Sequence, residues 1–223
     1  RFLAACSSHV RRADEAAITI LVATSGDPGS AVAAAFHRRP GFRVAILYPE
    51  GRVSPRQAHQ LGCLGDNVHA FRVAGSFDDC QRLVKLAFAD AALRERTPLA
   101  SANSISLGRL LPQAAYYAHA ALAHARRGGA PLGFIVPTGN LGNAFAAVMA
   151  RAMGLPIGAV HLATNANRTL PDFLASACYE GRDSVATMAN AMDVGDPSNA
   201  ERLRWLHPDI GALRAAVSAD TVD

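Results

Sequence analysis

The chain has 223 residues, half of them hydrophobic, with 22 Lys and Arg against 18 Asp and Glu for a formal net charge of +4. This length can bury the core of one large domain or two small ones. The mean hydropathy is only +0.12, and because every long apolar stretch is interrupted by charge or glycine, we expect no membrane span.

Strands and helices are expected to alternate along most of the chain. The expected elements, in order, are helix 1–13, strand 18–23, helix 29–38, strand 43–48, helix 54–63, strand 67–73, helix 77–95, an extended piece 99–103, helix 105–127, strand 132–137, helix 142–153 and strand 158–164. Strands that are apolar on both faces, such as 44–47, are typical of parallel strands covered by helices. The predicted fold is therefore α/β, with three-layer, open, mostly parallel sheets and ligand-binding loops at the carboxyl ends of the strands.

The pattern loosens after residue 165. Residues 178–200 contain Gly181, Gly195 and Pro197 and are expected to form a long loop, a feature that is often functional in compact domains. Two short amphipathic helices are expected to close the chain.

Two apolar runs, 18–22 and 134–136, each end in a turn rich in Gly, Asn and Ser. Each turn leads directly into an alanine-rich segment that is expected to be a helix. The turns are Thr24-Ser25-Gly26-Asp27-Pro28-Gly29-Ser30 and Pro137-Thr138-Gly139-Asn140-Leu141-Gly142-Asn143. A helix start of this kind presents unpaired N–H groups and a positive dipole end, which together bind phosphate or carboxylate. Either turn alone is equally typical of a purely structural strand–helix connection. Their pairing favours a site that holds two anionic groups.

A third segment, 101–109, also precedes an expected helix and places Ser104 and Arg109 about one helical turn apart. A hydroxyl and a guanidinium suit a phosphate, whereas an N-cap with a solvated arginine is the structural alternative. Neither a P-loop nor a G-x-G-x-x-G dinucleotide fingerprint is present.

Taken together, these segments resemble threonine synthase, a fold-type II enzyme family dependent on pyridoxal 5′-phosphate and similar in fold to the tryptophan synthase β chain. The resemblance rests on residues 23–27, 47–55, 103–113, 137–144 and 191–199, in matching order and spacing. It implies a carbon–oxygen lyase acting on phosphates, which converts O-phospho-L-homoserine and water to L-threonine and phosphate in threonine biosynthesis.

The resemblance also implies site residues. The loop formed by Gly139, Asn140, Leu141, Gly142 and Asn143 would hold the cofactor phosphate. Asp27 would contact the pyridoxal ring hydroxyl, Thr24 and Ser25 would flank the substrate carboxylate, and Ser104 and Arg109 would hold the substrate phosphate.

Two departures from the family pattern concern substrate contact and catalysis. Pro28 stands where the family usually has Thr and removes an N–H and a hydroxyl. The family's Schiff-base lysine would lie shortly before Arg1, so no catalytic residue is assigned, and Lys85, the only lysine, is expected on a helix surface. The N-terminal residues look like the middle of a helix, so we expect an internal, incomplete fragment.

The expected domains are 1–100, part of a small α/β domain, and 101–223, the first part of the large cofactor domain, with the site at their cleft. Two alternatives remain open: another fold-type II lyase of the serine/threonine dehydratase kind, or a non-catalytic module that binds small phosphorylated ligands. The Ser104 and Arg109 pair disfavours the dehydratase, whose substrates carry no phosphate.

The remaining composition indicates a cytoplasmic protein without a metal. The four scattered cysteines are expected to be buried thiols in a reducing compartment, and the histidines form no ligand-like cluster. The arginine pairs lie at the ends of expected helices and form no basic stripe, so we expect a small-molecule substrate and no nucleic acid.

Overall fold

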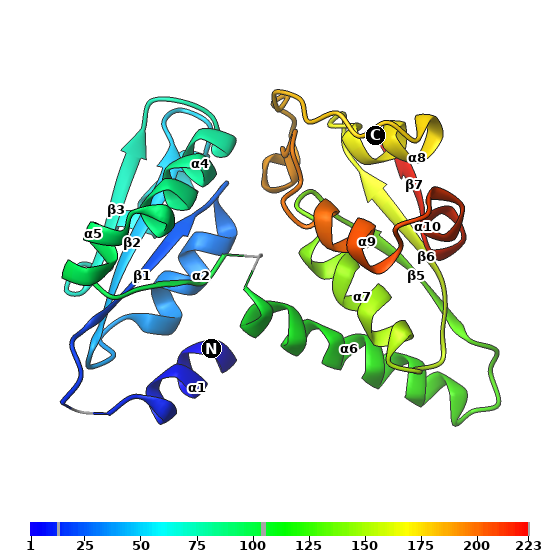
Figure 1. Cartoon of the computed structure of the whole chain (residues 1–223), viewed down its shortest axis with the longest axis horizontal. Coiled ribbons are helices and arrows are strands. Elements are labelled where there is room, and N and C mark those ends of the chain that lie inside the picture. The colour runs from blue at the N-terminus through cyan, green and yellow to red at the C-terminus, as the bar shows by residue number, and fades with distance from the viewer. Residues whose placement is uncertain (13, 104–105, 223) are drawn as a thin grey trace. The chain divides into compact units, whose positions relative to one another are not determined.

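The computed structural model describes residues 1–12, 14–103 and 106–222, and of Asp27 it describes the backbone only. The chain divides into two compact units, Arg1–Ser106 and Leu107–Asp223. Each is built on its own parallel sheet (Figure 1), and each is described by itself below. The predicted α/β fold with parallel sheets is confirmed.

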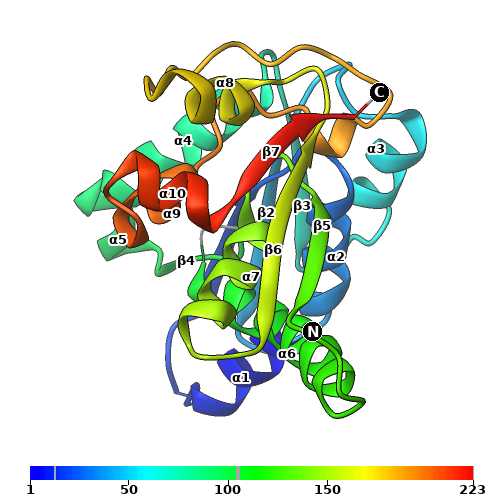
Figure 2. The ribbon, with the colours of Figure 1, turned by 90° about the vertical axis from the view of Figure 1, so that its right-hand side faces the viewer.

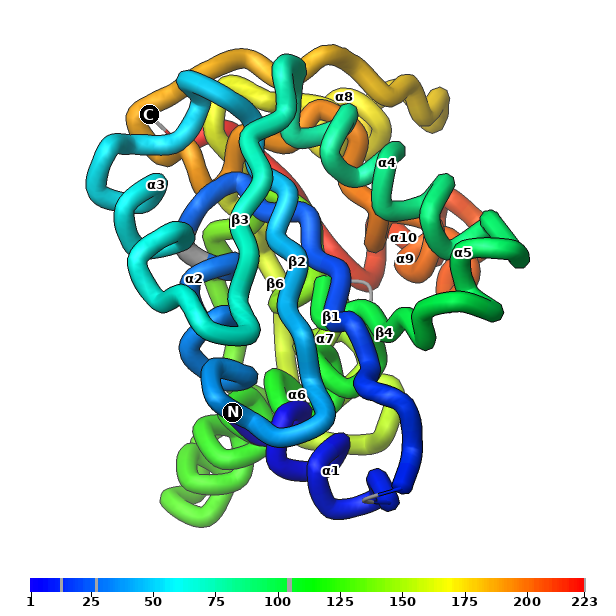
Figure 3. The backbone as a smooth tube through the Cα atoms, turned by 90° about the vertical axis from the view of Figure 1, so that its left-hand side faces the viewer, coloured from blue at the N-terminus to red at the C-terminus, as the bar shows by residue number. Residues whose placement is uncertain are grey.

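The first unit contains a four-stranded sheet in the order β3-β2-β1-β4, in which every pairing is parallel. Its strands are β1 (Ile18–Ala23), β2 (Phe42–Pro49), β3 (Val68–Val73) and β4 (Leu99–Ser101), and its helices are α1 (Phe2–Val10), α2 (Asp27–Phe36), α3 (Pro55–Gly62), α4 (Phe77–Ala89) and α5 (Ala91–Arg96). Helices α2 and α3 cover one face and α4 the other (Figure 3), as right-handed crossovers require. The core lies between these layers around Val22, Val44, Ile46 and Phe36.

Two helix starts in this unit follow from local sequence. Ser54 and Gln57 form a capping box with Pro55 in the first turn, and Ser76 and Asp79 form a second capping box. The expected helix 77–95 is broken at Asp90, whose carboxylate accepts a hydrogen bond from the N–H of Leu93 at 3.0 Å. An aspartate that caps a new helix competes with continuation of the old one, so α4 ends and α5 begins there.

The second unit contains a three-stranded parallel sheet in the order β5-β6-β7 (Figure 2). Its elements are α6 (Leu107–Ala125), β5 (Leu132–Pro137), α7 (Gly142–Ala152), β6 (Ile157–Thr164), α8 (Thr169–Ser176), the 3-10 turn η1 (Asn190–Met192), α9 (Ala200–Leu206), α10 (Ile210–Ala216) and β7 (Ser218–Thr221). Helix α7 packs on both α6 and β6. Its buried alanines, Ala144, Ala146, Ala147 and Ala150, let the helix approach its neighbours closely.

One helix and one strand of this unit were not predicted. Helix α8 carries Pro171, but a proline in the first helical turn removes an N–H that has no intrahelical partner. Strand β7 reads Ser-Ala-Asp-Thr, a sequence without the usual β-formers, and it pairs at the sheet edge with β6 from His161 to Thr164. The two predicted closing helices correspond to α9 and α10, and the loop before α9 is long, as expected.

Within the described residues, no helix combines the length and the apolar character that crossing a membrane requires.

The expectation that all four thiols are buried is wrong for three of them. Cys6, Cys63 and Cys178 are exposed, and only Cys80 is buried. Burial raises the pKa of the Cys80 thiol to about 12, which removes the reactive thiolate at neutral pH. We therefore expect three thiols per chain to react rapidly with Ellman's reagent at pH 8. The fourth should react only on addition of denaturant, and four equally fast thiols would contradict the buried position of Cys80.

Candidate functional site

The second glycine-containing loop lies between β5 and α7, as predicted. Strand β5 ends at Pro137, and the N–H of Thr138 still donates to the carbonyl of Ala163 on β6 at 3.0 Å. The chain then turns through Gly139 and Asn140 to Leu141, which has a left-handed φ of 60°, and α7 begins at once. The loop therefore occupies the carboxyl edge of the sheet, the edge at which open α/β folds bind ligands.

The start of α7 offers backbone donors. In the part of the second unit that the structure describes, the N–H groups of Leu141, Gly142 and Asn143 meet no protein acceptor. The first turn of a helix leaves such donors unpaired by geometry, and the helix dipole adds a positive partial charge there. This arrangement suits a dianionic phosphate without any cationic side chain.

The side chain of Asn143 serves the loop itself. Its Oδ1 accepts from Thr138 Oγ1 at 2.7 Å and from the N–H of Ala144 at 2.9 Å. Its Nδ2 donates to the carbonyl of Pro137 at 2.8 Å. Asn143 therefore ties the end of β5 to the start of α7, and its backbone N–H is left to contact a ligand.

The first loop, in the other unit, is organised by the hydroxyl of Thr24. This oxygen donates to the carbonyl of Gly26 at 3.0 Å and accepts from the N–H groups of Gly26 at 3.1 Å and Gly29 at 2.9 Å. Thr24 is only 1% exposed, so its hydroxyl shapes the turn from inside. A Cβ on Gly29 would lie 2.5 Å from Thr24 Cγ2, which explains the glycine at this position.

Pro28 fits the start of α2, where it lies in the first turn and its missing N–H removes no intrahelical bond. Ser25 in the same loop is buried, at 8% exposure. The side chain of Asp27 and the whole of Ser104 lie outside what the structure describes, so their predicted roles remain predictions.

Arg109 lies in the first turn of α6 and is half-buried. Loss of solvent on burial lowers the pKa of its guanidinium, but arginine stays charged at neutral pH. The predicted contact of this guanidinium with a substrate phosphate remains a prediction.

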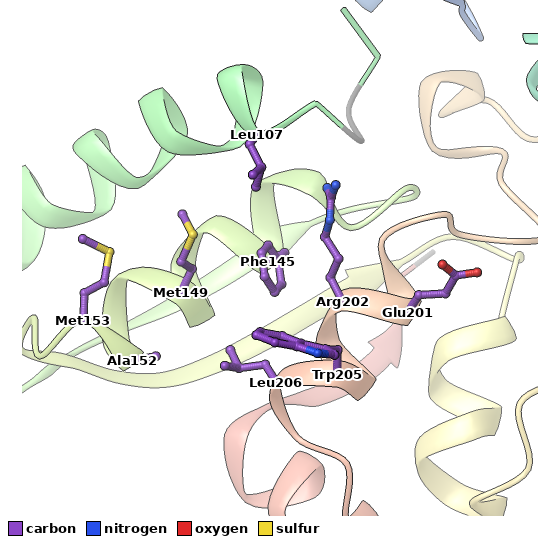
Figure 4. Close-up of a pocket in the computed structure, with 9 residues that line it drawn as sticks. All are labelled: Leu107, Phe145, Met149, Ala152, Met153, Glu201, Arg202, Trp205 and Leu206. Atoms are coloured by element: carbon purple, nitrogen blue, oxygen red, sulfur yellow. The ribbon is translucent and has the colours of Figure 1, made fainter. Parts of the chain in front are cut away.

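The second unit also contains a cavity away from the loop at 139–143. A cavity of about 620 Å³ opens between α7, α9 and the first residue of α6, and its walls are mostly apolar (Figure 4). The lining residues are Leu107, Phe145, Met149, Ala152, Met153, Glu201, Arg202, Trp205 and Leu206. These walls suit apolar side chains better than a phosphate, so the cavity is distinct from the loop at 139–143.

The sequence did not indicate which segment of the chain contacts the loop at 139–143. The structure supplies one in residues 190–199, which were expected only to form part of a long loop. The backbone of Met192 comes so close to Gly139 that a Cβ there would lie 2.8 Å from Met192 Cα. The sequence signal available was the resemblance motif at 191–199, although a motif does not reveal which residues touch.

Comparison with known proteins gives a consistent result. The family model described as "Pyridoxal-phosphate dependent enzyme" matches residues 2–221. A threonine synthase from Serratia marcescens is 43% identical over 228 residues, which cover 99% of this chain and 52% of that protein.

Solved structures agree. The crystal structure of threonine synthase from Escherichia coli superposes with a TM-score of 0.90 at 38% identity, covering 99% of this chain and 51% of that one. A pyridoxal-phosphate-bound threonine synthase from Brucella melitensis gives 0.80 at 36% identity, covering 98% and 52%. The chain thus spans about half the length of the relatives that it matches.

Proposed function

Because the chain belongs to the family of pyridoxal-phosphate-dependent enzymes, we propose that it is the phosphate-binding part of a threonine synthase. The reaction would convert O-phospho-L-homoserine and water to L-threonine and phosphate. Sequence identity of 42–44% to threonine synthases from several bacteria supports this assignment.

The observation that carries the proposal is the loop at Gly139–Asn143. Pyridoxal 5′-phosphate fits there because its phosphate needs several N–H donors and room for close backbone approach. The start of α7 has the donors, and Gly142 adds no side chain. When bound, the cofactor supplies an electron sink for carbanions next to the amino group. The loop holds the phosphate and thereby sets the position of the ring.

The other residues take supporting roles in this proposal. Ser104 and Arg109 would hold the substrate phosphate, Asp27 would contact the ring hydroxyl, and Ser25 would contact the substrate carboxylate. Thr24 would act through the shape of its turn, since its hydroxyl already bonds within that turn. The first unit would be part of the small domain and the second the first part of the large cofactor domain of a cytoplasmic enzyme.

The proposal is tested with the full-length protein that contains this chain. We expect release of inorganic phosphate from O-phospho-L-homoserine with stoichiometric formation of threonine, dependent on pyridoxal 5′-phosphate. Formation of a keto acid from serine or threonine without phosphate release would instead assign a dehydratase. Cofactor binding without turnover of any of these amino acids would assign a binding module.

Replacement of Arg109 by alanine should weaken use of the substrate without weakening binding of the cofactor. A hydrogen bond to a charged group contributes about 1.5–3 kcal/mol, so kcat/KM for O-phospho-L-homoserine should fall by about 10- to 150-fold. The dissociation constant for pyridoxal 5′-phosphate should stay within about twofold. Arg109→Lys keeps the charge but not the planar, two-pronged guanidinium, so its kcat/KM should lie between those of the unmodified protein and Arg109→Ala. Equal losses of substrate and cofactor binding in Arg109→Ala would refute the assigned role.

A further inference from the structure

We propose that residues 190–199, called here the brace segment, position the loop at 139–143 for phosphate binding, with Asn199 as the positioning residue. This inference rests on the proposed function, because it specifies how that loop is held in a binding-competent shape. Its support comes entirely from contacts within the second unit.

Asn199 and Ser198 each donate a hydrogen bond to a different oxygen of Asn140. The Nδ2 of Asn199 donates to the backbone carbonyl of Asn140 at 2.7 Å. The N–H of Ser198 donates to Oδ1 of Asn140 at 2.6 Å. Asn199 has no exposed surface, and its own Oδ1 accepts from Arg202 Nη1 at 2.7 Å, so its amide orientation is determined.

The bond to the Asn140 carbonyl matters because of peptide planarity. The carbonyl of Asn140 and the N–H of Leu141 belong to one planar trans peptide and point in opposite directions. Fixing the carbonyl toward Asn199 therefore directs the Leu141 N–H away from the brace segment. The same bond helps to hold Leu141 at φ 60°, a backbone region that a residue with a branched side chain rarely occupies without support.

A steric contact reinforces these hydrogen bonds. Gly139 lies against the main chain of Met192, and a Cβ at residue 139 would come within 2.8 Å of both its Cα and its carbonyl oxygen. The loop is thus backed by main chain at Gly139 and held by hydrogen bonds at Asn140.

The brace segment is itself anchored to the rest of the unit. Asp193 accepts from Asn165 Nδ2 at 2.8 Å and from Thr187 Oγ1 at 2.7 Å. The carbonyl of Gly195 accepts from Thr169 Oγ1 on α8 at 2.6 Å. The loop at 139–143 is attached to the sheet directly, because it follows β5. It is also connected to the end of β6 and to α8 through the brace segment, because Asn165 follows β6 directly and Thr169 lies on α8.

The test compares binding of pyridoxal 5′-phosphate with binding of pyridoxal, which lacks the phosphate, by equilibrium dialysis of the chain. Both ligands are measured on a Lys85→Arg background, which removes the only lysine side chain that could form a Schiff base, so the ratio of the two dissociation constants reports on phosphate recognition. We expect the unmodified chain to prefer the phosphorylated form and Asn199→Ala to reduce that preference by about fivefold, the loss expected for one hydrogen bond. Pyridoxal binding should stay unchanged.

A matched control separates positioning from stability. Arg151→Met removes two hydrogen bonds to backbone carbonyls, those of Gly158 and Ala216, near the far end of α7. It should lower the melting temperature and leave the preference unchanged. If Asn199→Ala fails to fold by circular dichroism, Asn199→Leu, which keeps the volume of the side chain without adding charge, should show the same loss.

The outcomes are distinguishable. An unmodified chain that does not prefer the phosphorylated ligand overturns the phosphate assignment, and the positioning role with it. A chain that shows the preference and retains it in the Asn199 variants overturns the positioning role alone.

Discussion

Substitution of Gly139 by alanine should abolish the preference for pyridoxal 5′-phosphate over pyridoxal. The added Cβ would lie 2.8 Å from Met192 Cα and from its carbonyl oxygen, and both are main-chain atoms that cannot rotate away. The loop must therefore shift, which should cost about 1–3 kcal/mol of stability and move the N–H groups at the start of α7. The ratio of dissociation constants, measured by equilibrium dialysis, should approach one.

The matched control is the same substitution where space is open. Gly62 ends α3, and a Cβ there would meet no atom within 4 Å, so Gly62→Ala should stabilise the chain by about 0.5–1 kcal/mol and leave ligand preference unchanged. If Gly139→Ala retained the full preference, the loop would not be the phosphate site.

The second large effect concerns Lys85. The 223 residues contain no other lysine, and this one is exposed on α4. A Schiff-base lysine works in a site that orients its amine and excludes water, and α4 provides no such surroundings. The chain mixed with pyridoxal 5′-phosphate should therefore form no threonine and give no more Schiff-base absorbance than a Lys85→Arg variant.

The full-length protein containing this chain is the positive comparison, since it should show both the absorbance and the product. A stoichiometric Schiff base at Lys85, or threonine produced by the 223 residues alone, would overturn the assignment of this lysine to the surface.

Much of the fold was predictable because strong local signals agree with the packing. Val44 and Ile46 lie in an apolar run that the structure buries in a parallel sheet, and Ser54 and Pro55 mark the start of α3. The apolar spacing on α4 indicates its buried face only in part: Val84 is buried, but Leu83 is 38% exposed. Cys80 and Gln81 are buried on this helix instead. The face of a helix that is buried depends on how the helix packs against the sheet, and the spacing of apolar residues predicts that face only approximately.

The site was predictable to the level of the loop and no further. Glycines between an apolar strand and an alanine-rich helix indicate where N–H groups are exposed, and the structure places Gly139–Asn143 at such a point. It could not be read from sequence that Thr24 and Asn143 direct their side chains into their own loops. The hydrogen bond between Asn140 and Asn199, 59 residues away, could not be predicted from the sequence either, because it depends on tertiary packing.

The most direct test of the central claim is a titration of the ¹⁵N-labelled chain with pyridoxal 5′-phosphate, followed by amide chemical shifts. The phosphate should move the resonances of Gly139, Leu141, Gly142 and Asn143 in a saturable way, and equal concentrations of pyridoxal should leave them in place. Shifts confined to Lys85 and its neighbours on α4, with the loop unmoved at saturation, would contradict the claim that these N–H groups bind the cofactor phosphate.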